Sequence, residues 1–318
     1  MRRLPYIIQL LGLLALISGC DKLIYDNLEN CPQGVHFAIY EQTPCQSGPS
    51  YPAAIQQIRI YAFDANNVLT EVYEDNNITL TSEYLLETFF YKIGTFTFIA
   101  WGGTDLSAYN FSSFEKNKTT KDEMLVSLKR QSDEYNGKAQ PLYYGISTPL
   151  TIKDRSKVGT IFDLVKINMQ EITNRVWLTL HGLPETGNYS VTITDDNSVY
   201  NFDANYAVDT RFNYITDTYR EGAILKADFS LMKLSEGRST RLTIKNTKTD
   251  KIIYDVNLIE DIILYKGDSG EPPYSLACNH DFRIVIVFNT NPEDQETYML
   301  LKIVVNDWNV VSRPVILE

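Results

Sequence analysis

The sequence predicts an all-β protein made of two tandem β-sandwich domains. Apolar and polar residues alternate in many short runs, such as IQQIRIYAF at 55–63 and GTFTFIAWGG at 94–103. A period of two residues is typical of strands. Turn sequences such as DANN and LPETGN separate these runs about every 8–12 residues, a spacing typical of sandwiches and barrels. The chain has 21 Tyr, 14 Phe and only 3 Trp residues, and aromatic enrichment also favours strands.

Two segments show a helix-like spacing of apolar residues, SEYLLETFFYK at 82–92 and TKDEMLVSLKR at 120–130. Either could form a helix. Neither has the capping residues or the clean amphipathic face that usually mark one. The sequence therefore predicts little helix.

Residues 1–19 are predicted to be a lipoprotein signal peptide. Their apolar stretch follows two arginines and is shorter than the roughly 20 residues of a membrane-spanning helix. It ends in ISGC at 17–20, which resembles the bacterial lipobox. In that motif the cysteine sulfur, here that of Cys20, takes a diacylglyceryl group, the chain is cleaved before it, and the new amine is acylated. The alternative is an ordinary signal peptide with a chance cysteine at its end.

The mature chain would then comprise residues 20–318, held in a bilayer by the lipid on Cys20. One acyl chain binds only marginally, so several are needed for stable anchoring. The formal net charge is −11, and loss of Arg2 and Arg3 lowers it by two, to −13. Such an acidic protein is a poor partner for nucleic acid. The charge also argues against contact of the folded body with anionic headgroups.

The predicted domain boundaries follow changes in composition. Residues 20–33 contain the lipid-bearing cysteine and a polar tether that ends in a turn signal. The stretch STPLTIKDRSKVGT at 147–160 has little periodicity, and strand-like runs resume after it. We therefore expect a first sandwich at 34–155 and a second at 156–318.

Three cysteines remain after Cys20 is assigned to lipid, namely Cys31, Cys45 and Cys278. A disulfide among them is plausible outside the cytoplasm, but three thiols leave one unpaired. Cys31 and Cys45 are nearest in sequence, yet the strand-like VHFAIY between them would hold them apart. Any of the three pairings is open, and so is a reduced state in which all three are small buried thiols.

The sequence lacks the motifs of common hydrolases, zinc proteases and phosphate-binding loops. The segment TDDNS at 194–198 resembles half of a calcium loop but lacks the required glycine and distal glutamate, so a hairpin turn is preferred. The histidines share no ligand spacing: His36, His181 and His280. The sequence thus predicts no enzyme, no cofactor apart from covalent lipid, no metal site and no small-molecule substrate.

Several segments resemble the fimbrillin-A-associated anchor proteins of Bacteroidales, the lipoprotein subunits at the base of type V pili. The family starts with Cys-Asp, followed by a Tyr-Asp-x-Leu…Cys-Pro segment, which matches CDKLIYDNLENCP at 20–32. The strand from Ile58 to Asp64, the IAW motif at 99–101 and VNDWNV at 305–310 also fit. The stretch 41–51 departs from the Tyr- and Asn-rich loop of many members, which leaves the role of Cys45 open.

The resemblance implies two transthyretin-like Greek-key sandwiches and a minor fimbrium anchoring subunit. Such a subunit is expected at the outer membrane, lipid-anchored and facing the cell surface, where it fixes the pilus base and limits its length. Its partners would be other fimbrial subunits, the stalk or first shaft subunit, joined by strand addition, in which one subunit's strand completes a sheet of another.

The candidate partner strand lies in the C-terminal segment YMLLKIVVNDWNVVSRPVILE, 298–318. The alternative, which the pattern favours, is that this segment is the last strand of its own sandwich. Pro314 would break a central ladder, so pairing there should be edge-like. The candidate contact residues are Tyr298, Leu300, Ile303, Val305 and Trp308.

Two other classes of function are compatible with parts of the sequence. A surface glycan-binding lipoprotein of a nutrient uptake system would share the lipid anchor, the acidity and the sandwiches, but needs exposed aromatic platforms. Trp101, Trp177 and Trp308 all lie in or beside strand-like runs, which favours core or interface packing. A lipoprotein hydrolase would need a catalytic site, and the sequence offers none.

Overall fold

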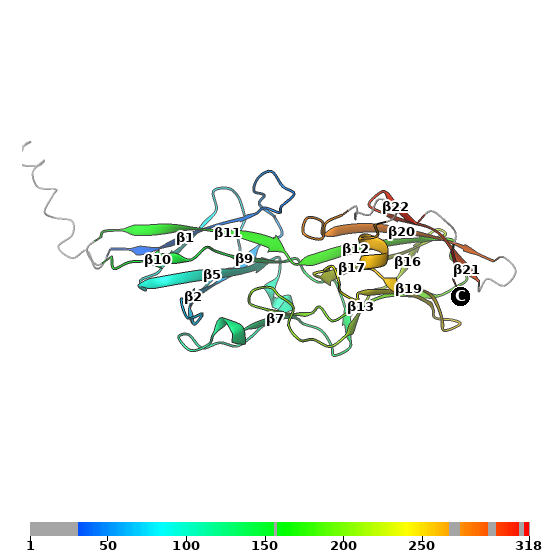
Figure 1. Ribbon diagram of the computed structural model, residues 1–318, viewed down its shortest axis with the longest axis horizontal. Helices are drawn as coiled ribbons and strands as arrows, with labels where there is room; N and C mark the ends of the chain where they lie inside the picture. The colour runs from blue at the N-terminus through cyan, green and yellow to red at the C-terminus, as the bar shows by residue number, and fades with distance from the viewer. Residues whose placement is uncertain (1–30, 156–157, 267–273, 292–296, 312–314, 318) are drawn as a thin grey trace, which may run out of the picture.

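The computed structural model describes residues 31–155, 158–266, 274–291, 297–311 and 315–317 of the chain. Nearly all of the regular structure in these residues is β-strand, and the strands form four sheets. Figure 1 shows an elongated molecule whose two halves lie end to end. The all-β prediction is confirmed.

An eight-stranded sheet forms most of the first half. Its strand order is β3-β2-β5-β9-β11-β1-β4, and β10 also pairs with β5. β1 and β11 are parallel, whereas the other neighbouring strands run antiparallel. The strands are β1 (Gln33–Glu41), β2 (Gln57–Asp64), β3 (Leu69–Asp75), β4 (Leu85–Phe89), β5 (Gly94–Gly103), β9 (Leu142–Ile146), β10 (Leu150–Ile152) and β11 (Ile161–Glu171).

Two main sheets form the second half. The seven-stranded sheet has the order β16-β17-β12-β20-β21-β22, with β23 paired to β21, and the five-stranded sheet has the order β19-β18-β13-β15-β8. The first contains β12 (Thr173–His181), β16 (Tyr219–Glu221), β17 (Ile224–Met232), β20 (Asp281–Thr290), β21 (Tyr298–Val305), β22 (Trp308–Val311) and β23 (Val315–Leu317). The second contains β8 (Glu134–Asn136), β13 (Tyr189–Asp195), β15 (Phe212–Ile215), β18 (Arg241–Asn246) and β19 (Lys251–Asn257).

The predicted boundary between 155 and 156 does not divide the sheets. β11 lies beyond that boundary, yet it pairs with β1 and β9 of the first sheet. Conversely, β8 lies before it and pairs with β15 of the second half. The chain crosses between the halves at Ile172, the single residue that separates β11 from β12. The aperiodic stretch 147–160 is a connection within the first half, which the sequence pattern alone does not distinguish from a linker.

The first hydrophobic core lies within the eight-stranded sheet. It is built from inward-facing residues of the alternating strands, as their period of two predicts. Fully buried members from β1, β2, β5 and β11 include Val35, Phe37, Ile58, Ile60, Phe98 and Ile167.

The second hydrophobic core extends from the first half into the second. Tyr61, Phe63 and Trp101 lie on the opposite face of β2 and β5 from the first core and are also buried. A three-stranded sheet belongs to this region, in the order β14-β7-β6. Its strands are β6 (Tyr109–Phe111), β7 (Leu125–Leu128) and β14 (Val199–Asn201). Because β14 comes from the second half of the sequence, this core ties the two halves together.

Both segments considered for helices form other structures. Residues 82–92 contain β4, whose register with β1 turns Leu86 and Thr88 inward and leaves Leu85 and Phe89 exposed. Residues 120–130 form one 3₁₀ turn, η3 (Lys121–Glu123), and then β7. In each case a neighbouring strand satisfies the backbone hydrogen bonds, which outweighs a weak local helix preference. The described residues also form two other short helices, η2 (Leu106–Ala108) and a π-helical turn, η4 (Ile259–Ile263).

A buried ion pair fixes the loop after β7 to the loop before β15. The Arg130 guanidinium stacks on Phe212 at 4.3 Å and donates to the Asp209 carboxylate at 2.7 Å. Asp209 also accepts bonds from the Ser198 amide (2.8 Å) and hydroxyl (2.6 Å). Burial alone would raise the pKa of Asp209, but these hydrogen bonds outweigh it and hold the pKa below its ordinary value.

We expect Asp209→Asn to lower the free energy of unfolding by about 3 kcal/mol at pH 7, because it leaves a buried guanidinium without its carboxylate. A folded-state pKa below the unfolded value stabilises the protein above that unfolded value, near 4, and the stabilisation is lost as pH falls through the folded pKa. The difference between variant and wild type should therefore shrink below about pH 4 in urea titrations. Asp250→Asn is the control, because Asp250 pairs with Lys245 at the surface and its side chain is 87% exposed. This substitution should change the free energy of unfolding by less than about 0.5 kcal/mol. Equal effects of the two substitutions would contradict this account.

Candidate functional site

The described chain begins at one end of the first half. Cys31 is buried, and the carbonyls of Pro32 and Gln33 accept bonds from the amides of Ile161 and Phe90. The predicted lipid-bearing Cys20 lies outside the described residues, so lipid attachment stays a prediction. Hydrogen bonds nevertheless fix the point at which the chain enters the first sheet.

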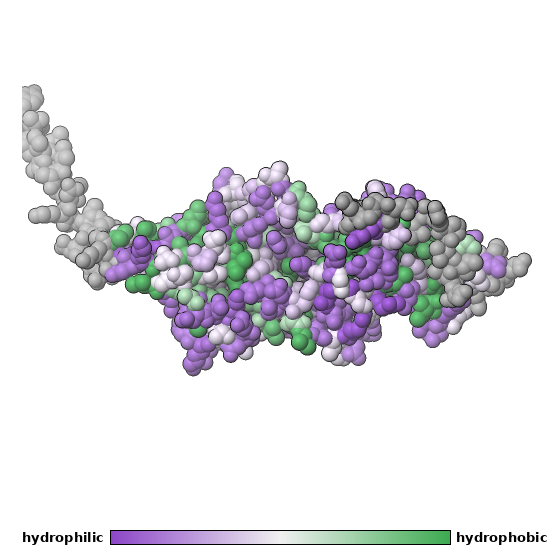
Figure 2. Space-filling model, in the orientation of Figure 1, coloured by the Kyte–Doolittle hydropathy of each residue, from purple (hydrophilic) through white to green (hydrophobic). Residues whose placement is uncertain are grey.

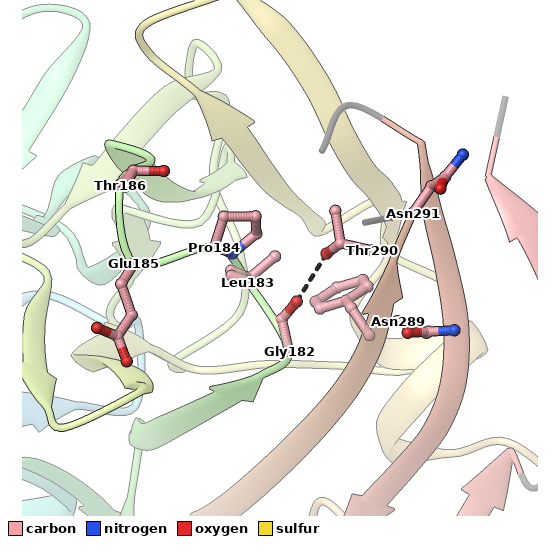
Figure 3. Close-up of a pocket in the computed structure, with 9 residues that line it drawn as sticks. Gly182, Leu183, Pro184, Glu185, Thr186, Asn289, Thr290 and Asn291 are labelled. Atoms are coloured by element: carbon pink, nitrogen blue, oxygen red, sulfur yellow. Dashed lines mark hydrogen bonds between the residues drawn. The ribbon is translucent and has the colours of Figure 1, made fainter. Parts of the chain in front are cut away.

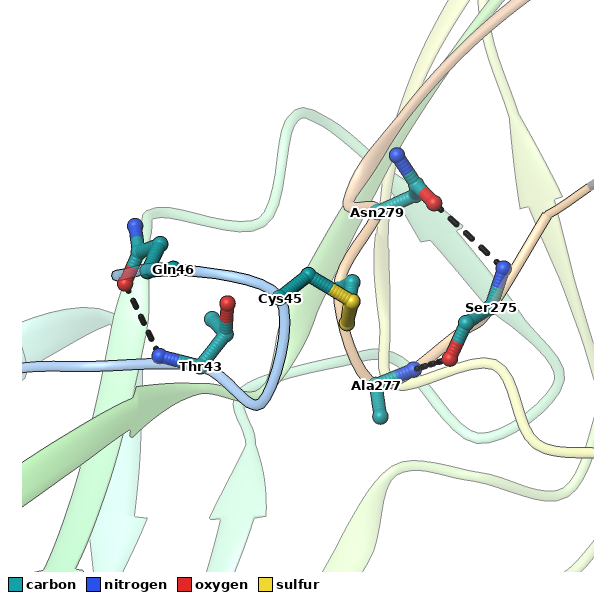
Figure 4. The surroundings of a disulfide bond; sticks show 7 residues. Thr43, Cys45, Gln46, Ser275, Ala277 and Asn279 are labelled. Atoms are coloured by element: carbon teal, nitrogen blue, oxygen red, sulfur yellow. Dashed lines mark hydrogen bonds between the residues drawn. A yellow bond between two sulfur atoms is a disulfide. The ribbon is translucent and has the colours of Figure 1, made fainter. Parts of the chain in front are cut away.

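A disulfide joins the two halves (Figure 4). It links Cys45, in the loop after β1, with Cys278, in the loop before β20, and the Cα atoms are 5.9 Å apart. This pairing is one of the three that the sequence left open. Cys31 pairs with no cysteine in the part of the chain that the structure describes.

Local hydrogen bonds shape both loops of the disulfide. The amide of Thr43 donates to Oε1 of Gln46 at 2.8 Å, and the amide of Ala277 donates to the Ser275 hydroxyl at 3.3 Å. These contacts place the two cysteine side chains toward each other, as Figure 4 shows. The stretch 41–51, which departs from the family pattern in sequence, is therefore the segment that carries this bridge.

A polar cluster lies beside the crossing from β11 to β12. Arg175 donates to both carboxylate oxygens of Glu171, at 2.6 and 3.2 Å, and also pairs with Asp281 at the start of β20. Burial raises the pKa of the nearby Glu41, while the Ser50 hydroxyl opposes this by donating a hydrogen bond to it. The charged members of the cluster are paired with one another, and this arrangement fits a role in fixing the junction.

The predicted partner strand is mostly an internal strand of its own sheet, which corrects the prediction. β21 pairs with β20 on one side and with β22 and β23 on the other. Four of the five predicted contact residues are buried inside this half: Tyr298, Leu300, Ile303 and Val305. Their alternating pattern fills the sheet's own core, which matches the interpretation of this segment as the last strand of its own sandwich.

Trp308 differs from the other four residues. It opens β22, the last strand on one side of the seven-stranded sheet, and its side chain is 51% exposed. At the other side of the same sheet lies β16, where Tyr219 is 43% exposed. Among the described strands, β22 pairs only with β21, so its outer backbone groups can accept another strand.

A cleft of about 440 Å³ opens in the second half, where β12 and β20 end (Figure 3). It is lined by 182–186 and 288–291, and the Thr290 hydroxyl donates to the Gly182 carbonyl at 2.7 Å. Gly182 has φ +78°, and a Cβ there would lie 1.9 Å from the Phe288 carbonyl oxygen, so glycine is required. Among the described residues that line the cleft, Glu185 alone is ionisable, and it points away from the other side chains in Figure 3. These described residues therefore offer no pair of acid and base side chains.

The three histidines lie far apart in the structure. His36 stacks on Phe162 and lies 2.9 Å from Glu87, His181 ends β12, and His280 lies beside the junction, where burial lowers its pKa. The described residues contain no group of three His, Cys, Asp or Glu side chains placed to hold a metal ion. None of the described helices is both long and apolar enough to span a bilayer.

The TDDNS segment is not a hairpin turn. It leads from β13 in the five-stranded sheet to β14 in the three-stranded sheet. Asp195 is buried there and accepts a hydrogen bond from the Thr240 hydroxyl. The predicted hairpin turn is therefore wrong, because the pairing of the flanking strands depends on contacts that are distant in sequence.

The three tryptophans offer little surface for sugar stacking. Trp101 is fully buried, and Trp177 lies under the Arg283 guanidinium at 5.2 Å. Trp308 is the exposed member of the set. A stacking platform usually needs a large exposed ring, so two of the three positions do not suit glycan binding.

The comparisons with known proteins fit this elongated, sheet-built architecture. A sequence model of the fimbrillin-A associated anchor proteins Mfa1 and Mfa2 matches residues 28–314. The chain belongs to this family. The resemblance noted in the N-terminal motifs is thereby confirmed, and the matched range covers both halves of the molecule.

Individual proteins resemble this chain in sequence, in fold or in both. The minor fimbrium anchoring subunit Mfa2 of Porphyromonas gingivalis is 31% identical over 313 residues, which cover 97% of this chain and 94% of that protein. The solved structure of the fimbrial anchor protein Mfa2 from the same organism has a TM-score of 0.76 at 28% identity, covering 89% of this chain and all of that one. A candidate polysaccharide-binding protein of Bacteroides thetaiotaomicron has a TM-score of 0.70 at 19% identity, covering 88% and 97% of the two chains. At that identity the likeness concerns the fold alone.

Proposed function

We propose that the protein is a structural subunit that anchors a fimbrium to the outer membrane. The observation that carries this proposal is the 31% identity, across nearly the whole chain, to a minor fimbrium anchoring subunit. The lipobox adds a means of attachment, since the lipid on Cys20 would hold the chain at its N-terminal end. The shape supports the same role, because the first and second halves lie end to end (Figure 1).

The proposed place for a fimbrial partner is the β22 edge of the seven-stranded sheet. An edge strand offers unpaired backbone groups, and a partner strand could add there through main-chain hydrogen bonds. Trp308 would supply an exposed aromatic anchor beside that edge, a residue type enriched at binding hot spots. A subunit fixed in this way at the base would also end the polymer, which supports a role in limiting fimbrial length.

The first test is Cys20→Ala in the native host. A thiol is required for lipid attachment, so we expect both the protein and its fimbriae to appear in the culture medium. The measurement is immunoblotting of medium and membrane fractions together with electron microscopy of the cells. If the protein is released while fimbriae stay attached, anchoring is contradicted, and glycan binding by the released protein becomes the question to test.

The proposed partner edge predicts a specific effect of Trp308→Ala. We expect the variant to stay in the membrane and to keep its stability within about 0.5 kcal/mol, as usual for exposed positions. Loss of a hot-spot side chain costs about 2 kcal/mol or more in binding, roughly a thirtyfold loss of affinity for fimbrial subunits. Co-purification of fimbrial subunits with the membrane-bound variant measures the effect.

Tyr219→Ala provides the matched control, because Tyr219 is similarly exposed at the opposite edge of the same sheet. This variant should retain fimbrial subunits at the wild-type level. If Tyr219→Ala loses them and Trp308→Ala does not, the partner adds at the β16 edge instead.

A further inference from the structure

An exposed apolar cluster lies at the end of the first half where the described chain begins. It consists of Phe89, Tyr91, Ile93 and Val158, whose exposed fractions are 55%, 63%, 65% and 43%. We call these four residues the apolar tip. In Figure 2, hydrophobic residues in green gather at this end of the molecule.

The aromatic members of the apolar tip have a fixed arrangement. The rings of Phe89 and Tyr91 stack with centroids 6.4 Å apart and an interplanar angle of 11°, and Phe89 also lies 6.1 Å from the ring of Phe162. Below them, Phe90 is buried and packs edge-on against Phe96 at 4.8 Å. The exposed rings therefore stand on a packed base, and among the described strands β4 pairs only with β1.

The apolar tip surrounds the start of β1. The amide of Phe90, between Phe89 and Tyr91, donates to the Gln33 carbonyl at 3.1 Å. The Gln33 side-chain amide donates to the carbonyls of Arg155 (2.9 Å) and Val158 (3.1 Å). The segments that carry the exposed apolar side chains are thus bonded directly to the residues that lead back toward Cys20.

Chain length limits how far the apolar tip can lie from a lipid on Cys20. Ten residues, 21–30, separate Cys20 from Cys31. Even a fully extended connection spans at most about 40 Å. An acyl-anchored Cys20 therefore keeps this end of the protein within about 40 Å of the bilayer surface.

Charges of both signs lie around the apolar tip. Arg155 pairs with Asp163, and Lys92 lies 3.5 Å from Glu71. The negative charge of the chain is therefore partly balanced at this end. Contact of the apolar tip with a bilayer would be driven by apolar burial and would not require anionic lipid.

We propose that the apolar tip inserts into the headgroup and upper acyl region of the bilayer leaflet that holds the lipid on Cys20. Tyrosine and phenylalanine side chains suit this region, because their rings are apolar and the tyrosine hydroxyl can stay in water. The folded body then contacts the membrane directly, in addition to its covalent tether. This inference rests on the proposed lipid attachment of Cys20.

The test places a tryptophan at the apolar tip through Tyr91→Trp, with Tyr219→Trp as the matched control in the second half. The mature chain is bound to neutral phosphatidylcholine vesicles that contain brominated acyl chains, which quench tryptophan on contact. Two tethers are compared: the native lipid on Cys20, and a hexahistidine tag before residue 21 on nickel-chelating lipid. We expect the added fluorescence of Tyr91→Trp to be lost with both tethers, and that of Tyr219→Trp to be retained.

Each other outcome has a defined meaning. If Tyr91→Trp is no more quenched than Tyr219→Trp on the nickel-held vesicles, the apolar tip does not touch lipid and the inference is overturned. If added fimbrial subunits shield Tyr91→Trp from aqueous iodide while lipid leaves it unquenched, the tip binds protein, which also overturns it. If the natively processed chain fails to sediment with vesicles, the proposed lipid attachment fails, and the nickel-held arm still decides the role of the tip.

Discussion

Replacing Cys45 and Cys278 together with serine is expected to lower the free energy of unfolding by about 4 kcal/mol. The disulfide closes a loop with a sequence separation of 233 residues. A cross-link over such a distance restricts the unfolded chain strongly, and the entropic stabilisation grows with loop length. The loss should appear in calorimetry as a melting temperature lower by roughly 6 °C.

Reduction of the wild-type protein provides the control for this prediction. Dithiothreitol should lower the melting temperature of the wild type toward that of the double serine variant and leave the variant unchanged. Cys31→Ala should keep its sensitivity to reductant, because Cys31 takes no part in the bridge. Identical melting of the oxidised wild type and the double variant would contradict a stabilising role for the bridge.

Trp101→Ala is expected to cost about 4 kcal/mol of stability, the range for removing a large aromatic side chain from a core. The side chain is fully buried, and its ring lies 5.2 Å from Tyr144, 5.9 Å from Phe202 and 6.2 Å from Phe111. Phe202 comes from the second half of the sequence. The cavity would therefore weaken the packing between the halves, and urea unfolding followed by circular dichroism measures the loss.

Trp101→Phe tests whether the loss of stability comes from the size of the cavity or from replacing tryptophan as such. It keeps an aromatic ring in place and should cost clearly less than the alanine variant. Trp308→Ala, at an exposed position, should stay near wild type. A cost below about 1 kcal/mol for Trp101→Ala would mean that neighbouring side chains collapse into the space, and the proposed coupling between the halves would be wrong.

The strands could be predicted because their apolar and polar side chains alternate along the chain. The sequence could not predict that both faces of a strand such as β2 are buried. In β2 the sequence placed Ile58 and Ile60 opposite Tyr61 and Phe63, and the structure confirms the two faces. It also buries both, one in the first core and one in the second. The second burial depends on β14 and Phe202, more than a hundred residues away, which no local period can reveal.

The candidate sites show the same limit. The lipobox is a local motif, so Cys20 can be proposed from a few adjacent residues. The pairing of Cys45 with Cys278 requires the two halves to be placed relative to one another, and the sequence could only leave it open. The pattern of the C-terminal segment left two interpretations open, because an alternating segment looks the same whether it fills its own sheet or that of a partner. β21 fills its own sheet, and of the five candidate contact residues Trp308 alone is exposed.

The parallel pairing of β1 with β11 has a mechanical consequence for an anchor under tension. The two strands are in register over nine residue pairs, from Gln33 with Ile161 to Glu41 with Met169. A membrane tether would pull β1 from its start, while the second half pulls β11 from its end through β12. The pull acts along the strands, so the hydrogen bonds between them resist together in shear and do not break one after another.

The disulfide limits how far the chain can extend if β1 and β11 separate under force. A force applied between residues 31 and 308 can pass from Cys45 directly to Cys278, which leaves residues 46–277 outside the stretched covalent path. Roughly 800 Å of potential chain extension is thereby removed. Optical-tweezer pulling between these two positions should reveal that extra length only after reduction. An oxidised anchor would thus keep a fimbrium close to the cell even when its first half gives way.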